Sequence, residues 1–135
     1  MKRLLPLALL ALAVGACRGR GGHLSGTPGT DEVFAAWEKA GLAATDIKPF
    51  EPSRYGAGFC AQARVNGLEA LVCEYADDAA LVRGKQQLEQ QWDAEKVRTG
   101  VTVRAKRTLV GLTDRANSDT QGRTLGKLIT VVRKL

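Results

Sequence analysis

The chain has 135 residues, a formal net charge of +6 at pH 7, one histidine and three cysteines. This length suits one small domain and excludes an array of several domains. The single histidine and the lack of any Cys-x-x-Cys spacing exclude the common metal and dithiol sites that depend on those residues.

The first 17 residues have the pattern of a secretion signal. Two basic residues, Lys2 and Arg3, precede an apolar run over residues 4–13, and small residues lead up to Cys17. The run has ten residues, which is too short to span a bilayer. The segment Val14-Gly15-Ala16-Cys17 resembles the lipobox of bacterial lipoproteins, and the chain is similar in this segment to small lipoproteins of Gram-negative bacteria.

This resemblance implies that residues 1–16 are a signal peptide and that Cys17 carries the lipid. A diacylglycerol thioether plus an amide-linked acyl chain would anchor the mature chain stably in a membrane. Arg18 stands where an Asp would mark retention at the inner membrane, so the resemblance implies the outer membrane, facing the periplasm. The alternative is an ordinary signal peptide cleaved near Ala16, with an incidental cysteine.

Residues 17–30 are expected to form a tether and residues 31–135 a single folded domain. Five glycines and almost no apolar side chains occur between Arg18 and Thr30, which is typical of a flexible linker. A helix is expected from Thr30 to about Ala40, with acidic residues in its first turn. Prolines and glycines over residues 45–58 then exclude anything longer than a short edge strand.

Asn66-Gly67 between two apolar runs predicts a hairpin with a two-residue turn. This register pairs Val65 with Leu68 and places Cys60 opposite Cys73 at a site where a cross-strand disulfide fits. Because the domain would mature in an oxidising compartment, we predict that these two cysteines form a structural disulfide. The alternative is a redox-active or metal-binding thiol pair.

The second half of the chain repeats the order of hairpin and helix. A helix is expected from Asp77 or Asp78 to about Lys96, followed by a hairpin over 101–112 that turns at Lys106-Arg107, although this dipeptide favours a longer turn. A last helix, starting near Ser118 or Asp119, is predicted by apolar residues at helical spacing over 125–132. A closing strand over residues 129–132 is the competing interpretation.

Together these elements predict an α+β fold in the order α-ββ-α-ββ-α. We expect a mainly antiparallel sheet of about four strands, made of the two hairpins, with the helices packed on one face.

Positive charge gathers at the C-terminal end of the sequence. Residues 18–95 carry a net charge of −4, whereas residues 96–135 carry +8. We expect a basic surface that contacts an anionic envelope component or an acidic protein surface, whereas nucleic acid is excluded by the expected location. The alternative is an ordinary solvated surface. The candidate residues are Arg104, Lys106, Arg107, Arg123, Lys127 and Lys134.

No motif for catalysis, a cofactor or a metal stands out in the sequence. The expected function is therefore a membrane-anchored, non-catalytic binding or scaffolding module. One alternative is a carboxylate-based envelope hydrolase, and another is a structural envelope protein without a specific ligand. The carboxylates that a hydrolase would draw on are Glu51, Glu69, Glu74, Asp77, Asp78 and Asp114.

Overall fold

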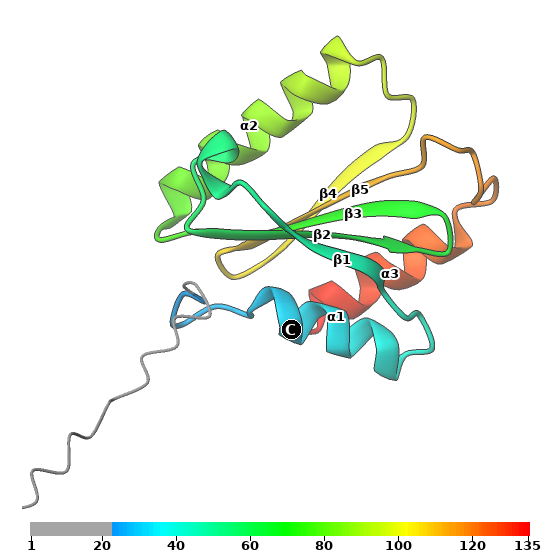
Figure 1. Cartoon of the computed structure of the whole chain (residues 1–135), viewed down its shortest axis with the longest axis horizontal. Helices are drawn as coiled ribbons and strands as arrows, with labels where there is room; N and C mark the ends of the chain where they lie inside the picture. The colour runs from blue at the N-terminus through cyan, green and yellow to red at the C-terminus, as the bar shows by residue number, and fades with distance from the viewer. Residues whose placement is uncertain (1–22) are drawn as a thin grey trace, which may run out of the picture.

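The structure is a computed structural model that describes residues 23–135 (Figure 1). Over that range the chain is α+β, with three α-helices, five strands and one short 3-10 helix. In chain order the elements are α1 (Thr30–Lys39), β1 (Thr45–Phe50), η1 (Pro52–Tyr55), β2 (Phe59–Val65), β3 (Leu68–Glu74), α2 (Asp78–Ala94), β4 (Gly100–Ala105), β5 (Thr108–Thr113) and α3 (Arg123–Arg133). The signal peptide expected over 1–16 and the lipidated Cys17 lie outside the described residues.

The five strands form one antiparallel sheet in the order β1-β2-β3-β5-β4. The predicted hairpin β2-β3 is confirmed in its register, with Val65 opposite Leu68 and Cys60 opposite Cys73. Asn66 and Gly67 both have positive φ, as a type I′ turn requires. The predicted disulfide joins Cys60 and Cys73, whose Cα atoms are 4.2 Å apart.

The hairpin β4-β5 also turns where the sequence predicts, but its turn has only two residues. Ala105 pairs with Thr108, and Lys106 takes the positive φ of 53° that the tight turn needs. The guanidinium of Arg107 donates hydrogen bonds to the backbone carbonyls of Tyr75 and Ala76. These long-range contacts hold an otherwise unfavourable dipeptide in the turn.

The sheet has five strands instead of the expected four, because residues 45–50 pair with β2. The pairing is irregular between Thr45 and Lys48, and Asp46 has a φ of +51°. Pro49 lacks an N–H donor, so its place in an edge strand agrees with the general restriction on proline in sheets. The irregular backbone explains why no alternating pattern marks β1 in the sequence.

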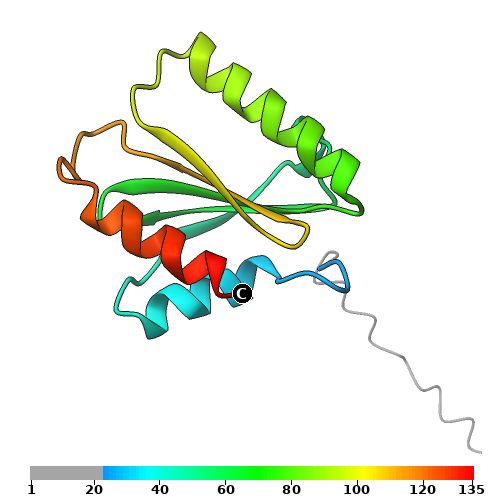
Figure 2. The same ribbon diagram turned by 180° about the vertical axis from the view of Figure 1, so that it is seen from behind.

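The helices cover both faces of the sheet, so the expectation that they share one face is wrong (Figures 1 and 2). The helices α1 and α3 pack on one face around residues such as Trp37, Val72 and Leu128. On the other face α2 packs through Leu88 and Trp92 against a second apolar cluster. Two helical layers are needed because β2, β3 and β5 bury side chains on both of their faces.

The last element is a helix, as the spacing of its apolar residues predicts. Leu128 and Val132 are fully buried against the sheet. The carboxylate of Asp119 accepts hydrogen bonds from the backbone N–H groups of Thr124 and Leu125, which would otherwise lack partners at the start of the helix. The strand alternative for residues 129–132 is therefore wrong.

Residues 23–29 do not behave as a flexible linker, in contrast to the tether expected over 17–30. They pack along the domain, and we call them the N-terminal strap. Leu24 fills the space above Gly58, where an added Cβ would come within 2.9 Å of its side chain. Thr27 and Thr108 share a hydrogen bond of 2.6 Å between their hydroxyl groups. The sequence shows no apolar period here because the strap is held mainly by polar contacts.

Among residues 23–135, no helix combines the length and the apolar content that crossing a membrane requires.

Candidate functional site

The six basic residues predicted as a surface fall into two groups. Arg104, Lys106 and Arg107 lie at the β4-β5 turn, whereas Arg123, Lys127 and Lys134 belong to α3 and its C-terminal end. The two groups differ in whether their charged side chains already have partners within the protein.

The arginines at the β4-β5 turn mainly support the fold. Arg104 forms an ion pair of 2.6 Å with Asp78 at the start of α2. Arg107 donates to two backbone carbonyls after β3, and also to the carbonyl of Ser25 in the N-terminal strap. These guanidinium groups connect segments that are distant in sequence, so they are poor candidates for a partner surface. Lys106 is exposed at the tip of the turn.

The α3 residues form one line along the outer side of the helix, which we call the α3 stripe: Arg123, Lys127 and Lys134. At 100° per residue their directions differ by no more than about 40°. All three are exposed, and the buried Leu128 and Val132 lie on the opposite side. Within residues 23–135, no carboxylate forms an ion pair with any of them.

A shallow groove of about 560 Å³ runs between the C-terminal end of α1 and the outer side of α3. Arg123 and Lys127 line it together with apolar groups from Leu42 and Val131. Gly126 lies between the two cationic residues in the sequence, and a Cβ added there would meet no atom within 4 Å. We call this the α3 groove. It combines cations, apolar carbon and open space.

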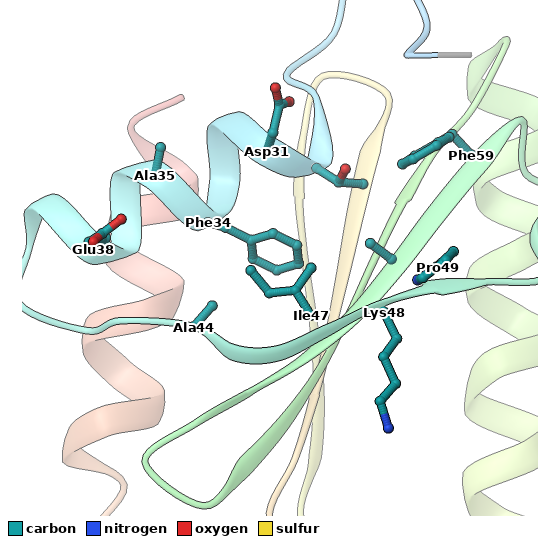
Figure 3. Close-up of a pocket in the computed structure, with 11 residues that line it drawn as sticks. Asp31, Phe34, Ala35, Glu38, Ala44, Ile47, Lys48, Pro49 and Phe59 are labelled. Carbon is teal, nitrogen blue, oxygen red and sulfur yellow. The ribbon is translucent and has the colours of Figure 1, made fainter. Parts of the chain in front are cut away.

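A second groove, of about 440 Å³, lies between α1 and the edge strand β1 (Figure 3). Phe34 of α1 and Ile47 of β1 line it, and Ile47 is 54% exposed. The side chains of Asp31 and Glu38 lie along its α1 wall. Two carboxylates therefore lie on the β1 side of α1, away from the α3 groove, and Lys48 of β1 lines the same groove as they do.

Glu74 is the most deeply buried charged residue of the described chain, with no exposed surface. Its carboxylate accepts hydrogen bonds from the backbone N–H of Leu24 and from that of Thr30, at 2.8 and 3.0 Å. The Nδ1 atom of His23 lies 2.8 Å from the same carboxylate. Glu74 thus attaches the N-terminal strap and the start of α1 to the sheet. Sequence reasoning missed this role because the partners are 44 to 51 residues away.

Arg115 connects strand β3 to the end of α2. Its Nε atom is 3.0 Å from a Glu69 carboxylate oxygen, and it also pairs with Glu95. A hydrogen bond from Gln91, together with one from Arg115, lowers the pKa of the Glu95 carboxyl. This ion-pair network was not predicted, since no local pattern connects its members.

The other carboxylates considered for hydrolysis are spread over the fold. Asp77 caps α2 by accepting from the backbone N–H of Ala80, and Glu51 caps η1 in the same way through Ser53. Asp114 accepts from the backbone N–H groups of Asp119 and Ser118, which lowers its pKa. Each of these groups has a structural partner. In the part of the chain that the structure describes, no three His, Cys, Asp or Glu side chains are grouped as metal ligands would be.

Comparison with protein-family models, with curated proteins and with solved structures gives no match to this chain.

Proposed function

We propose that this protein is a lipoprotein of the bacterial cell envelope, anchored through an acylated Cys17 in the outer membrane and facing the periplasm. In this proposal its domain is a non-catalytic binding module. The observation that carries the anchor is the sequence of basic residues, apolar run and Val14-Gly15-Ala16-Cys17. The disulfide between Cys60 and Cys73 supports it, because stable disulfides are typical of exported proteins.

The α3 stripe supports a binding role. Its three cations are exposed, aligned and without a carboxylate partner among residues 23–135. Charge of one sign on one face attracts partners of the opposite charge. The binding partner is therefore an anionic component of the envelope. The arginines of the β4-β5 turn are no longer part of the proposed surface, because their guanidinium groups already bind Asp78 and backbone carbonyls.

The anchor is tested with a Cys17→Ala variant expressed in a Gram-negative host. The native chain is expected to stay in the membrane fraction after a high-salt wash and to incorporate labelled palmitate, and the variant is expected to incorporate none. Palmitate incorporation by the variant would contradict acylation at Cys17.

The binding surface is tested by reversing the α3 stripe to glutamate in the anchored protein and recovering cross-linked partners from membranes. The matched control reverses three exposed cations elsewhere, Arg83, Lys85 and Arg98. Loss of partner recovery in the stripe variant alone supports the proposal. Equal recovery in both variants would remove the α3 stripe from consideration.

A further inference from the structure

The α3 groove has the chemistry of a site for a lipid phosphate. Arg123 and Lys127 line one open groove, and both lack ion-pair partners within residues 23–135. Guanidinium and ammonium groups are the side chains that proteins use most to bind phosphate. The volume of about 560 Å³ leaves room for a headgroup beside them.

Gly126 is unusual at its position and keeps the groove open. Glycine is unfavourable inside a helix, because it loses more backbone freedom on folding than other residues. Packing does not require it here, since an added Cβ would meet nothing within 4 Å. A longer side chain at Gly126 would instead extend into the space beside Arg123 and Lys127, where a ligand would lie.

The apolar part of the groove distinguishes a lipid from a simple ion. Leu42 is buried at its base, and Val131 lies on its α3 wall. A phospholipid places its phosphate directly beside glycerol and acyl carbons, which matches cations that lie next to apolar side chains. Of the three acidic residues of α1, Asp31 and Glu38 line the other groove, and none of the three forms an ion pair with Arg123 or Lys127.

The orientation of the chain also favours a membrane surface. The first described residues and the C-terminal end of α3 lie at the same end of the α1-α3 layer in both views (Figures 1 and 2). The α3 groove lies at the other end of this layer, beside the C-terminal end of α1, so an anchor that leads into the strap brings the groove to the bilayer when α1 and α3 lie along the membrane surface. Tethering raises the effective concentration of the headgroups, so even a weak site would be occupied.

We propose that the α3 groove binds the headgroup phosphate of an anionic phospholipid in the membrane that holds the anchor. This inference rests on the proposed function, which supplies the anchor. Arg123 and Lys127 contact the phosphate, and Lys134 adds attraction further along the α3 stripe.

The test uses the mature protein, extracted with its lipid and reconstituted into phosphatidylcholine vesicles with or without phosphatidylglycerol. An amine-reactive reagent labels the lysines, and mass spectrometry measures labelling at Lys127. Lys85 on α2 is the internal control, because it is also exposed and lies on the opposite side of the sheet. In the presence of phosphatidylglycerol we expect labelling of Lys127 to fall about fivefold and that of Lys85 to stay unchanged.

Two variants separate a bound headgroup from diffuse attraction. Gly126→Glu places a carboxylate beside the groove, and Gly126→Gln places a neutral side chain of similar shape there. The position is exposed and free of close contacts. We expect both variants to lose the protection of Lys127. Full protection in Gly126→Gln would overturn the proposal in favour of diffuse attraction.

Two further outcomes would also overturn the proposal. One is equal labelling of Lys127 in both kinds of vesicle. The other is that Lys127 is protected from labelling in native membranes but not in vesicles that contain only phosphatidylglycerol and phosphatidylcholine. That result would indicate an acidic protein partner. The anchor is assessed separately, by flotation with vesicles of phosphatidylcholine alone. Failure of the anchor and failure of the headgroup site therefore give different results.

Discussion

At the scale of single residues, the structure depends on buried polar groups whose partners are distant in sequence. Glu74 is the main example, since its carboxylate binds two backbone N–H groups and His23 while having no exposed surface. A buried charge is tolerated only when such partners are present. The strap is therefore part of the fold. Glu74 and Arg107 bind it to the rest of the domain, so an anchor upstream of the strap is connected to the domain through these two residues.

Replacing Glu74 with Gln tests this role. The amide offers a single acceptor oxygen and directs its NH₂ group toward donors, so at least one hydrogen bond to the strap is lost. We expect the free energy of unfolding to fall by about 2 kcal/mol, measured from urea unfolding midpoints. Glu38→Gln on the exposed side of α1 is the control and should change little. Equal midpoints for the two variants would contradict the role of Glu74.

Asp114 makes stability depend on pH. Hydrogen bonds from the backbone N–H groups of Asp119 and Ser118 lower its pKa below the ordinary value of 3.8. The charged form is favoured in the folded state, so the stabilisation is present above the unfolded pKa and is lost as pH falls through the lowered folded pKa. Asp114→Asn should therefore be less stable than the native chain at pH 7, with a difference that shrinks below about pH 4.

This prediction is checked by urea unfolding at a series of pH values between neutral and acidic. Asp93→Asn, an exposed position on α2, provides the matched control. A difference between native chain and Asp114→Asn that stays constant down to the most acidic value would show that the hydrogen bonds of Asp114 do not favour its charged form.

At the scale of the elements, two glycines inside helices have opposite surroundings. Gly84 of α2 lies against the sheet, where an added Cβ would come within 2.0 Å of the Tyr75 hydroxyl and 2.7 Å of the Tyr55 carbonyl. That hydroxyl is held by a hydrogen bond to the Tyr55 carbonyl, and burial raises the pKa of Tyr75 to about 12. Gly126 of α3 faces open space.

The same substitution should therefore have opposite effects at the two positions. Gly84→Ala is expected to destabilise the protein by about 2 kcal/mol, because α2 must move away from Tyr75. Gly126→Ala is expected to stabilise it by about 0.5 to 1 kcal/mol, since alanine favours the helix and meets no obstacle. Thermal unfolding of both variants tests this, and a stabilised Gly84→Ala protein would contradict the close packing of α2.

Elements were predictable from the sequence where their signals are local. The turn residues Asn66 and Gly67 specify the register of β2 and β3, and that register brings Cys60 opposite Cys73. Helical spacing of apolar residues likewise predicted α3. The irregular strand β1, the face that α2 covers and the docking of the strap depend on contacts between distant residues. No local pattern contains that information.

The candidate surface was predictable only where its residues lie on one helix. Residues on one helix keep their relative directions, so Arg123, Lys127 and Lys134 could be placed together from spacing alone. Arg104 and Arg107 resemble them in the sequence, but their partners, Asp78 and the carbonyls after β3, become neighbours only in the folded chain.

At the scale of the whole molecule, the two sides of the sheet have different roles. The side covered by α2 contains the disulfide and the second apolar cluster. The side covered by α1 and α3 presents the α3 groove and the groove between α1 and β1, and the strap leads into α1. In the proposed arrangement this second side faces the membrane, and the disulfide stabilises the layer behind it.

The most direct test of the account is the intact mass of the protein extracted from native membranes and alkylated without reductant. We expect the mass of residues 17–135 plus two or three acyl chains, with no alkylation at Cys60 or Cys73 until the sample is reduced. An unacylated or full-length mass with both thiols alkylated would contradict it, because the chain would then be neither anchored through Cys17 nor oxidised.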